Sequence, residues 1–333
     1  MASGLSTNPL KKIQLVRIAH VWYKHENVEA AKQFAQDFGF VETAQVGKTT
    51  FFRGYGTEPF ALAIEASDKN EFGGAAFVVE SEEDLVQACK TLPNACRATG
   101  VEEMKGYPGG GKQVTFYDPV DGFPFHLSPK KTQGFGQTPV AKEDPGFPIL
   151  KYNYPDEKQR GPNETQRFKK RPAPIHKLGH FGMCVTDFPK CLDFYTSYFN
   201  FYPSEILHNK DGVDKTVFFR LNRGADLVDH HCFFFFEGPK SHVHHSSFET
   251  HDFDAQVLGH DWLRHKGYTN CWGVGRHVMG SQIFDYWFDP SGFIMEHYVD
   301  GDLLDMREPT HRSQMTPDNI SVWGPEVPPT FLD

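Results

Sequence analysis

One hexapeptide pattern occurs twice in this chain, and its recurrence constrains the possible folds more than any other feature. Residues 48–53 read KTTFFR and residues 215–220 read KTVFFR. Each copy follows an apolar, strand-like segment around a histidine, His20 or His180, and then a segment with a helical pattern. The repeated unit includes the strand, the helical segment and the hexapeptide, and it is as long as a domain and much longer than a solenoid repeat. The sequence therefore predicts a duplicated domain.

The ends of the two halves also correspond. Residues 116–122 read FYDPVDG, and residues 287–292 read WFDPSG. Both halves therefore combine strands with helices, and the predicted fold class is α+β. The predicted organisation is an N-terminal domain at residues 1–129, a proline-rich linker at 130–174, a C-terminal domain at 175–300 and a tail at 301–333.

The composition is that of a globular enzyme. The length of 333 residues fits two domains with a sizeable core. A net charge of −9 argues against binding to nucleic acid or to anionic membranes, and no apolar stretch approaches the length of a membrane span. The N-terminus lacks the apolar core of a signal peptide, and the six cysteines form no CxxC pair. We therefore expect reduced thiols and a cytoplasmic location.

Three residues of metal-ligand type lie in apolar runs that read as strands of the second half. They are His180, His245 and Glu296. Two imidazoles and one carboxylate on one face of a divalent ion leave the other coordination positions open, as in non-haem Fe(II) oxygenases. His244 and His297 are adjacent to two of these residues, and strand alternation predicts that their side chains point away.

Three further polar residues complete a recognisable order. His231 precedes the second ligand by 14 residues, His277 ends the turn Gly275-Arg276-His277, and Tyr286 precedes Glu296 by ten residues. With the pair His244-His245 and the run PSGFIME at residues 290–296, the chain resembles the type I extradiol catechol dioxygenases of the vicinal oxygen chelate superfamily. The homoprotocatechuate 2,3-dioxygenases are the nearest group, and their C-terminal segment, which covers the mouth of the active site, is similar to the tail of this chain.

The resemblance implies tandem βαβββ modules, duplicated, with curved mixed sheets around a metal-containing cleft. It implies Fe(II), with Mn(II) as the alternative, held by His180, His245 and Glu296, and O₂ as co-substrate. His231 is then the acid/base residue, and His277 and Tyr286 bind the substrate oxygens. The expected reaction is extradiol cleavage of a substituted catechol to a muconic semialdehyde-type product, in the catabolism of aromatic compounds. The family also implies a homo-oligomer.

The first half lacks the same set of residues. His20 aligns with His180 and His126 with Glu296, but the position of the second ligand falls near Gly74, which has no side chain to offer. We therefore expect the N-terminal domain to be non-catalytic.

Two other functions remain open at this point: a metal-dependent lyase or isomerase of glyoxalase type, and a non-catalytic ligand-binding member of the same superfamily. Two local features bear on the pocket. Gly182, two residues after the first ligand, predicts a gap where relatives carry a polar residue, and Phe233 to Phe236 suggest strand core with some pocket lining. In the linker, four aromatic residues are expected to pack on the body, namely Phe135, Phe147, Tyr152 and Tyr154.

Overall fold

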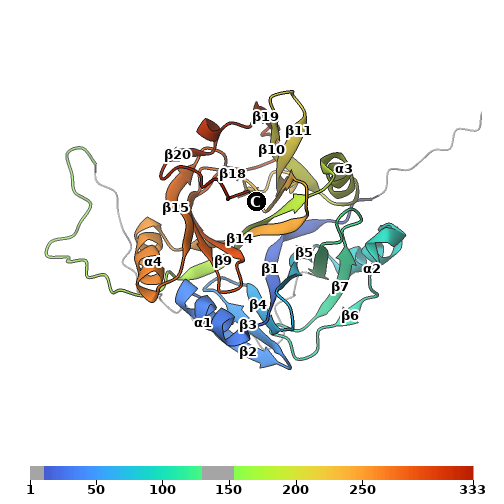
Figure 1. The fold of residues 1–333 in the computed structure, drawn as a ribbon, viewed down its shortest axis with the longest axis horizontal. Coiled ribbons are helices and arrows are strands. Elements are labelled where there is room, and N and C mark those ends of the chain that lie inside the picture. The colour runs from blue at the N-terminus through green and yellow to red at the C-terminus, as the bar shows by residue number, and fades with distance from the viewer. Residues whose placement is uncertain (1–10, 130–153, 333) are drawn as a thin grey trace, which may run out of the picture.

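Two curved sheets form the body of the molecule, as the computed structural model shows for residues 11–129 and 154–332 (Figure 1). The N-terminal half contains β1 (Leu15–His25), α1 (Val28–Phe38), β2 (Val41–Val46), β3 (Thr49–Arg53), β4 (Leu62–Ala66), β5 (Glu71–Val79), α2 (Glu82–Thr91), β6 (Glu102–Glu103), β7 (Lys112–Tyr117) and β8 (Pro124–Pro129). The C-terminal half contains β9 (Ile175–Val185), α3 (Phe188–Tyr198), β10 (Phe201–His208), β11 (Asp214–Leu221), β12 (Val228–Asp229), β13 (Phe233–Glu237), β14 (His242–Thr250), α4 (Phe253–Lys266), β15 (Asn270–His277), β16 (Ile283–Phe288) and β17 (Ile294–Val299). The tail adds β18 (Leu303–Leu304), β19 (His311–Gln314) and β20 (Ser321–Trp323).

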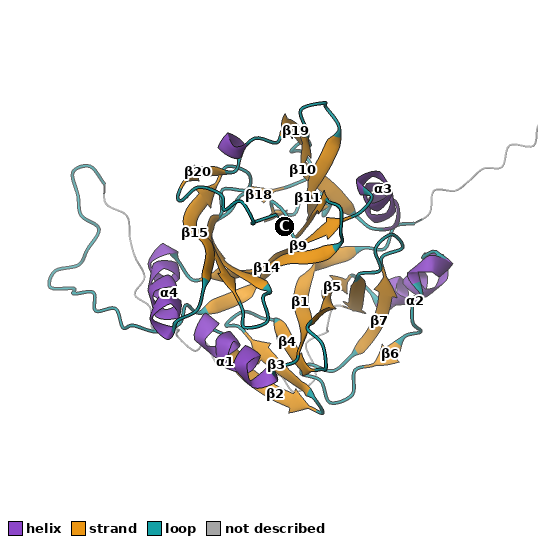
Figure 2. Ribbon diagram, in the orientation of Figure 1, coloured by secondary structure: helices purple, strands orange, loops and turns teal. Residues whose placement is uncertain are grey.

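The two sheets have the same strand order. The first runs β2-β3-β4-β1-β5-β8-β7-β6, and the second runs β10-β11-β13-β9-β14-β17-β16-β15 between two added edge strands. Each half is thus a pair of βαβββ modules, and the helices lie on the outside of the sheets (Figure 2). The predicted fold class, with duplicated modules and curved mixed sheets, is confirmed.

The start of α3 shows how local sequence shapes the module that carries His180. Asp187 accepts a hydrogen bond from the backbone N–H of Lys190, and Pro189 occupies the first turn, where a missing N–H costs nothing. β9 therefore ends five residues after His180, at Val185, and the helix begins at Phe188. Phe188 and Phe194 of that helix are buried against the sheet.

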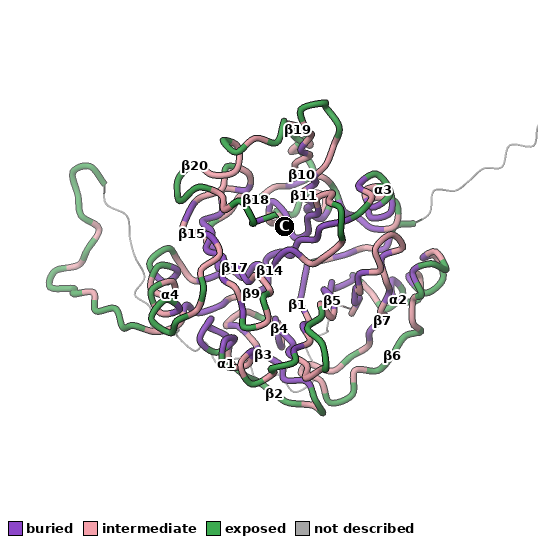
Figure 3. The backbone as a smooth tube through the Cα atoms, in the orientation of Figure 1, coloured by how far each residue is buried: buried purple, intermediate pink, exposed green. Residues whose placement is uncertain are grey.

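A single apolar core joins the two halves, and buried residues follow the inner strands of both sheets (Figure 3). Phe125 from β8 meets Phe181 of β9 and Phe233 of β13, with ring centroids 5.7 and 5.8 Å apart. Polar contacts also cross the boundary. The hydroxyl of Tyr23 lies 2.7 Å from that of Ser246, the residue after His245.

The tail is integrated into the C-terminal sheet. Its strands β19 and β20 form the two outer edges of the ten-stranded sheet, paired with β10 and β15. Figure 1 shows the C-terminal end inside the ring of C-terminal strands. A tail that supplies both edges of a sheet is a structural part of the half that it joins.

The described part of the linker, residues 154–174, is mainly loop. Tyr154 is 63% exposed, so the expectation that it packs on the body is wrong; its backbone is bonded locally to Glu157. Phe135, Phe147 and Tyr152 lie outside the described residues. Within the described ranges, no helix has both the length and the apolar character needed to cross a membrane.

Candidate metal centre

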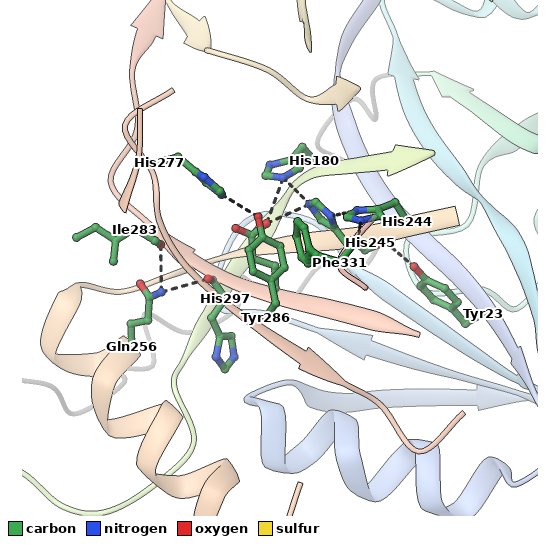
Figure 4. A network of polar contacts seen from close by, with 12 residues as sticks. Tyr23, His180, His244, His245, Gln256, His277, Ile283, Tyr286, His297 and Phe331 are labelled. Carbon is green, nitrogen blue, oxygen red and sulfur yellow. Dashed lines mark hydrogen bonds and ion pairs between the residues drawn. The ribbon is translucent and has the colours of Figure 1, made fainter. Parts of the chain in front are cut away.

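His180, His245 and Glu296 come together at the centre of the C-terminal sheet, from β9, β14 and β17. Nε2 of His180 lies 3.1 Å from Nε2 of His245, and Oε2 of Glu296 lies 3.2 and 3.3 Å from these two nitrogens. All three residues are buried. Figure 4 shows the two imidazoles pointing toward each other from neighbouring strands.

The register of three neighbouring strands explains this meeting. Ser247 of β14 pairs with His180 on one side and with Glu296 on the other, so these two side chains share a row across the sheet. His245 lies two residues before Ser247 and therefore points to the same face. His297, the neighbour of Glu296, points to the other face as expected, where its Nε2 donates to the carbonyl of Phe38 at 2.7 Å.

The donor set fits a divalent metal ion. Three ligand atoms on one face of an octahedron with bonds of about 2.1 Å lie about 3.0 Å apart, close to the separations seen here. Both carboxylate oxygens of Glu296 are buried without a hydrogen-bond partner among the described residues. Burial raises the pKa of this carboxyl, but the adjacent His180 and His245 outweigh it, so that the pKa lies well below its usual value. A buried carboxylate that faces two imidazoles without hydrogen bonds is the arrangement that a bound cation would satisfy.

The other three predicted site residues surround this group. His231, in the turn between β12 and β13, lies with its ring centroid 4.2 Å from that of His180. Tyr286 of β16 lies with its ring centroid 5.0 Å from that of His245. Its hydroxyl donates to Nε2 of His277 at 2.9 Å (Figure 4). The structure thus brings all six residues into one region, from six separate segments.

Burial controls the protonation of this outer group. It lowers the pKa of His231 well below the usual value, and the nearby His180 and His230 lower it further. Burial likewise lowers the pKa of His277 to about 4, although Glu296 acts in the opposite direction. Burial raises the pKa of Tyr286 well above its usual value, with a further contribution from Glu296. At neutral pH both imidazoles can accept a proton, and the phenol can donate a hydrogen bond.

The gap expected at Gly182 is filled by an aromatic ring. A Cβ at this position would lie 1.9 Å from the ring of Phe234, so the glycine makes room for that side chain. Phe234 lies with its centroid 5.1 Å from that of His245, and it stacks on Phe218. Phe233 and Phe235 point into the core instead. One wall of the site is therefore apolar, and only the alternate phenylalanine of the run contributes to it.

Sequence reasoning missed the partners that hold the site from behind. His244 was expected to be a neighbour of the site and not a ligand, which agrees with the structure, but its direct contact with the ligand was not foreseen: its Nδ1 lies 2.7 Å from Nδ1 of His245. His230 contacts His231 in the same way, at 3.1 Å. Two consecutive histidine pairs in the sequence were the available signal. The contribution of Phe331, whose carbonyl accepts from His244, had no sequence signal.

The equivalent face of the N-terminal half has a different set of residues. Ala76 of β5 pairs with His20 and with His126, which reproduces the row of His180, Ser247 and Glu296. Gly74 then occupies the position of His245, as predicted. A Cβ at Gly74 would lie 2.5 Å from Nε2 of His126, and its φ of +127° disfavours other residues. His126 donates through Nε2 to the carbonyl of Gly73 at 3.0 Å and accepts from the Thr115 hydroxyl at 2.9 Å, so both nitrogens are engaged.

Comparison with known sequences gives relatives of one kind. Residues 177–296 match the profile of the Glyoxalase/Bleomycin resistance protein/Dioxygenase superfamily. Metapyrocatechase 2 of Cupriavidus necator is 28% identical over 157 residues, a match that spans 47% of this chain and 47% of that protein. Biphenyl-2,3-diol 1,2-dioxygenase of Paraburkholderia xenovorans (strain LB400) is 24% identical over 317 residues, or 92% of this chain and 94% of that protein.

Solved structures share the whole fold at low sequence identity. Homoprotocatechuate 2,3-dioxygenase from Arthrobacter globiformis aligns with a TM-score of 0.78 and 18% identity, over 99% of this chain and 94% of that one. The Mn(II)-bound glyoxalase from Novosphingobium aromaticivorans aligns with a TM-score of 0.73 and 21% identity, over 95% of this chain and 93% of that one. These likenesses establish the common architecture.

Proposed function

We propose that this protein is an extradiol ring-cleaving dioxygenase acting on a substituted catechol, on the premise that its residues 177–296 match the Glyoxalase/Bleomycin resistance protein/Dioxygenase superfamily. The relatives named metapyrocatechase and biphenyl-2,3-diol dioxygenase support a catecholic substrate. The expected product is of the muconic semialdehyde type, formed with O₂ as co-substrate.

One observation carries this proposal. Three buried ligand atoms, 3.1 to 3.3 Å apart, leave one side of the group facing His231 rather than a fourth protein ligand. His180, His245 and Glu296 would hold the metal. When bound there, a divalent ion would supply a Lewis-acid centre at which the catechol and O₂ are held close together.

The remaining residues move and hold protons. His231 is neutral, buried and next to His180, so it can take a proton from a catechol hydroxyl and later return it. Tyr286 donates to His277, whose other nitrogen donates to the carbonyl of Ile320 at 3.0 Å. This bonded pair is held in a fixed orientation for contact with the substrate oxygens. Phe234 and Phe218 supply an apolar wall for the ring.

We propose Fe(II) as the metal, with Mn(II) as the alternative, because two imidazoles and a carboxylate suit either ion. The N-terminal domain at 1–129 would be a non-catalytic scaffold, and the domain at 175–300 would hold the site. The unpaired state of all six cysteines fits the proposed cytoplasmic location. A homo-oligomer stays a prediction from the family.

A glyoxalase-type lyase or isomerase is the second candidate, favoured by the shared fold with the Mn(II)-bound glyoxalase. Enzymes of that type draw four ligands from paired modules. Here the described residues give a single group of three ligand types, with His231, His277 and Tyr286 around it. That surrounding set is needed for a catechol and has no role in the lyase chemistry.

The test is anaerobic reconstitution of the metal-free protein with Fe(II), addition of 3,4-dihydroxyphenylacetate, catechol or 2,3-dihydroxybiphenyl, and then admission of air. We expect one metal per chain, stoichiometric O₂ uptake and a yellow ring-fission product with at least one substrate. A metal-loaded protein that consumes no O₂ with any of these catechols but isomerises a glutathione hemithioacetal would favour the second candidate. Failure to bind either metal would overturn both proposals.

A further inference from the structure

The last described residues of the tail pack directly behind the metal site. Phe331 is buried, and its ring centroid lies 4.8 Å from that of His244 and 4.9 Å from those of Tyr286 and Trp272. Upstream, β20 pairs with β15, so that Ser321 lies beside His277. The tail therefore reaches the site at two points, near His277 and near His244.

At the second point a chain of hydrogen bonds runs from the tail to a proposed ligand. The carbonyl oxygen of Phe331 lies 2.5 Å from Nε2 of His244, and Nδ1 of His244 lies 2.7 Å from Nδ1 of His245. Nε2 of His245 then faces His180 and Glu296. Figure 4 shows His244, His245 and Phe331 in this arrangement.

The chemistry of the end groups assigns every hydrogen in this chain. A carbonyl oxygen can only accept, so Nε2 of His244 must carry its hydrogen. A neutral imidazole with its hydrogen at Nε2 has a lone pair at Nδ1, which lies 2.7 Å from Nδ1 of His245, and only one hydrogen fits between these two nitrogens. His245 must therefore donate from Nδ1, which leaves the lone pair of its Nε2 directed at the metal position.

The same segment fixes a second imidazole in the same manner. The carbonyl of Ile320 accepts from Nδ1 of His277 at 3.0 Å, so Nε2 of that ring carries the lone pair that accepts from Tyr286. By contrast, Nδ1 of His180 is buried without a hydrogen-bond partner among the described residues. Of the two proposed histidine ligands, His245 is thus the one whose tautomer depends on the tail.

We infer that His244 is a positioning residue through which the docked tail, by the carbonyl of Phe331, holds His245 in its metal-binding tautomer. The inference rests on the proposed metal centre, but it concerns metal retention rather than ring cleavage. Metal-binding histidines are commonly oriented by a partner on their second nitrogen, and loss of that partner costs about 10- to 100-fold in metal affinity. Here the partner is itself controlled by whether the tail is in place.

Metal affinity is the direct readout, measured for Fe(II) without oxygen and for Mn(II) by competition with a chromophoric chelator. Full-length protein is compared with His244→Leu, His244→Gln and two truncations, one after Phe331 and one after Thr330. We expect His244→Leu and truncation after Thr330 to weaken binding by about 10- to 100-fold. His244→Gln should stay within a few-fold, because its amide can accept from His245 and donate to Phe331. Truncation after Phe331 should also stay close to full length, because the new carboxylate still accepts.

Combining His244→Leu with truncation after Thr330 gives a sharper test. Both changes break the same chain of hydrogen bonds from Phe331 to His245, so the double variant should bind metal no more weakly than His244→Leu alone. Multiplied losses would overturn the inference, as would unchanged affinity in either single variant. In both cases metal binding and O₂ uptake by the full-length protein would leave the proposed function intact.

A second measurement is made on the wild-type protein, and a variant is used only to assign its signals. In metal-free protein with ¹⁵N-labelled histidine, the N–H cross-peaks report which ring nitrogen carries hydrogen. We expect hydrogen at Nδ1 of His245 and at Nε2 of His244, with assignment by loss of the His244 signals in His244→Gln. The opposite tautomer at His245 would overturn the inference.

Discussion

The two halves of this molecule share a sheet order and a histidine at the first of three aligned positions, but they differ at the other two. Where the C-terminal half has His180, His245 and Glu296, the N-terminal half has His20, Gly74 and His126. In the C-terminal half the buried polar atoms face one another, whereas in the N-terminal half both ring nitrogens of His126 are already bonded to neighbours.

The space in front of these residues differs as well. The N-terminal half keeps a cavity of about 420 Å³ whose lining includes Trp22, Glu65, Gln113 and His126. Trp22 occupies the position equivalent to Gly182, and its indole N–H donates to Glu65 at 3.0 Å. The comparison shows that the fold supplies only the aligned positions on three neighbouring strands from which side chains can meet. A reactive centre additionally requires that the ligand atoms at those positions face one another and are not bonded to neighbouring groups outside the set.

The most damaging change should be to give the C-terminal half the residue of its counterpart. His245→Gly removes one of three ligands. Loss of a residue that is only hydrogen-bonded to a ligand lowers metal affinity by up to about 100-fold, and we expect a larger decrease here. Turnover should fall below detection. Metal content by elemental analysis and O₂ uptake measure both effects, and His126→Ala in the other half is the matched control, with metal and activity retained. Normal metal content in His245→Gly would remove His245 from the ligand set.

His231 has no metal-binding role in the proposal, so its loss should separate chemistry from metal retention. We expect His231→Phe to keep one metal per chain and to lose about 10²- to 10⁴-fold in kcat, because proton transfer by a positioned side chain contributes that much. Metal analysis and steady-state O₂ uptake are the measurements. A variant with full turnover would show that the proton moves by another route.

Building a second site in the N-terminal half should fail. Gly74→His combined with His126→Glu restores the residue types, but a Cβ at Gly74 would still lie 2.9 Å from the carbonyl oxygen of Pro124, and the backbone there has φ +127°. Strain of this kind costs about 1–3 kcal/mol, so we expect a lower Tm and still one metal per chain. Two metals per chain would mean that side-chain type alone separates the halves.

The smallest effect concerns the twin Asp-Pro turns. Burial raises the pKa of Asp289 to about 6, against 3.8 in an unfolded chain. The folded protein therefore holds this proton more tightly, so the contribution to stability is full below pH 4 and is lost as the pH rises to about 6. Relative to the wild type, the free energy of unfolding of Asp289→Asn should therefore increase by up to about 2 kcal/mol across that pH range. Asp118→Asn should change in the same direction but less, because Tyr195 donates to the Asp118 carboxylate at 3.1 Å. Chemical denaturation at pH 4 and pH 7 measures the free energy of unfolding of each variant relative to the wild type. A stabilisation of Asp289→Asn that decreases with rising pH would contradict a raised pKa of Asp289.

The sequence predicted the duplicated architecture because the two KTxFFR strands and the two Asp-Pro turns are local patterns with a fixed place in each module. The six site residues could be found for the same reason, since each lies in a short motif of distinctive type. The contact of His244 with His245 lies at a bulge of β14, where alternation alone does not specify the direction of a side chain. Phe331 acts through its backbone carbonyl, and every residue has one, so no sequence pattern could mark it.

The expectation about Gly182 failed for a related reason. A missing side chain in the sequence was taken as empty space, yet a ring from the next strand, Phe234, fills it. Packing density is a property of neighbours in space, and a single sequence does not list those neighbours.

The contact between Tyr23 and Ser246 has a consequence for how such a duplicated protein can evolve. Tyr23 belongs to the half that lost its ligands, but its hydroxyl holds the strand that carries His245 at the residue beside that ligand. Selection for the reaction therefore also constrains the N-terminal half, at the residues that contact the C-terminal half. The opposite side, with Trp22 and the cavity, is released from that constraint and can drift or acquire a new role. Duplicates fused in this way diverge on one face only, and neither copy can be deleted or exchanged as an independent part.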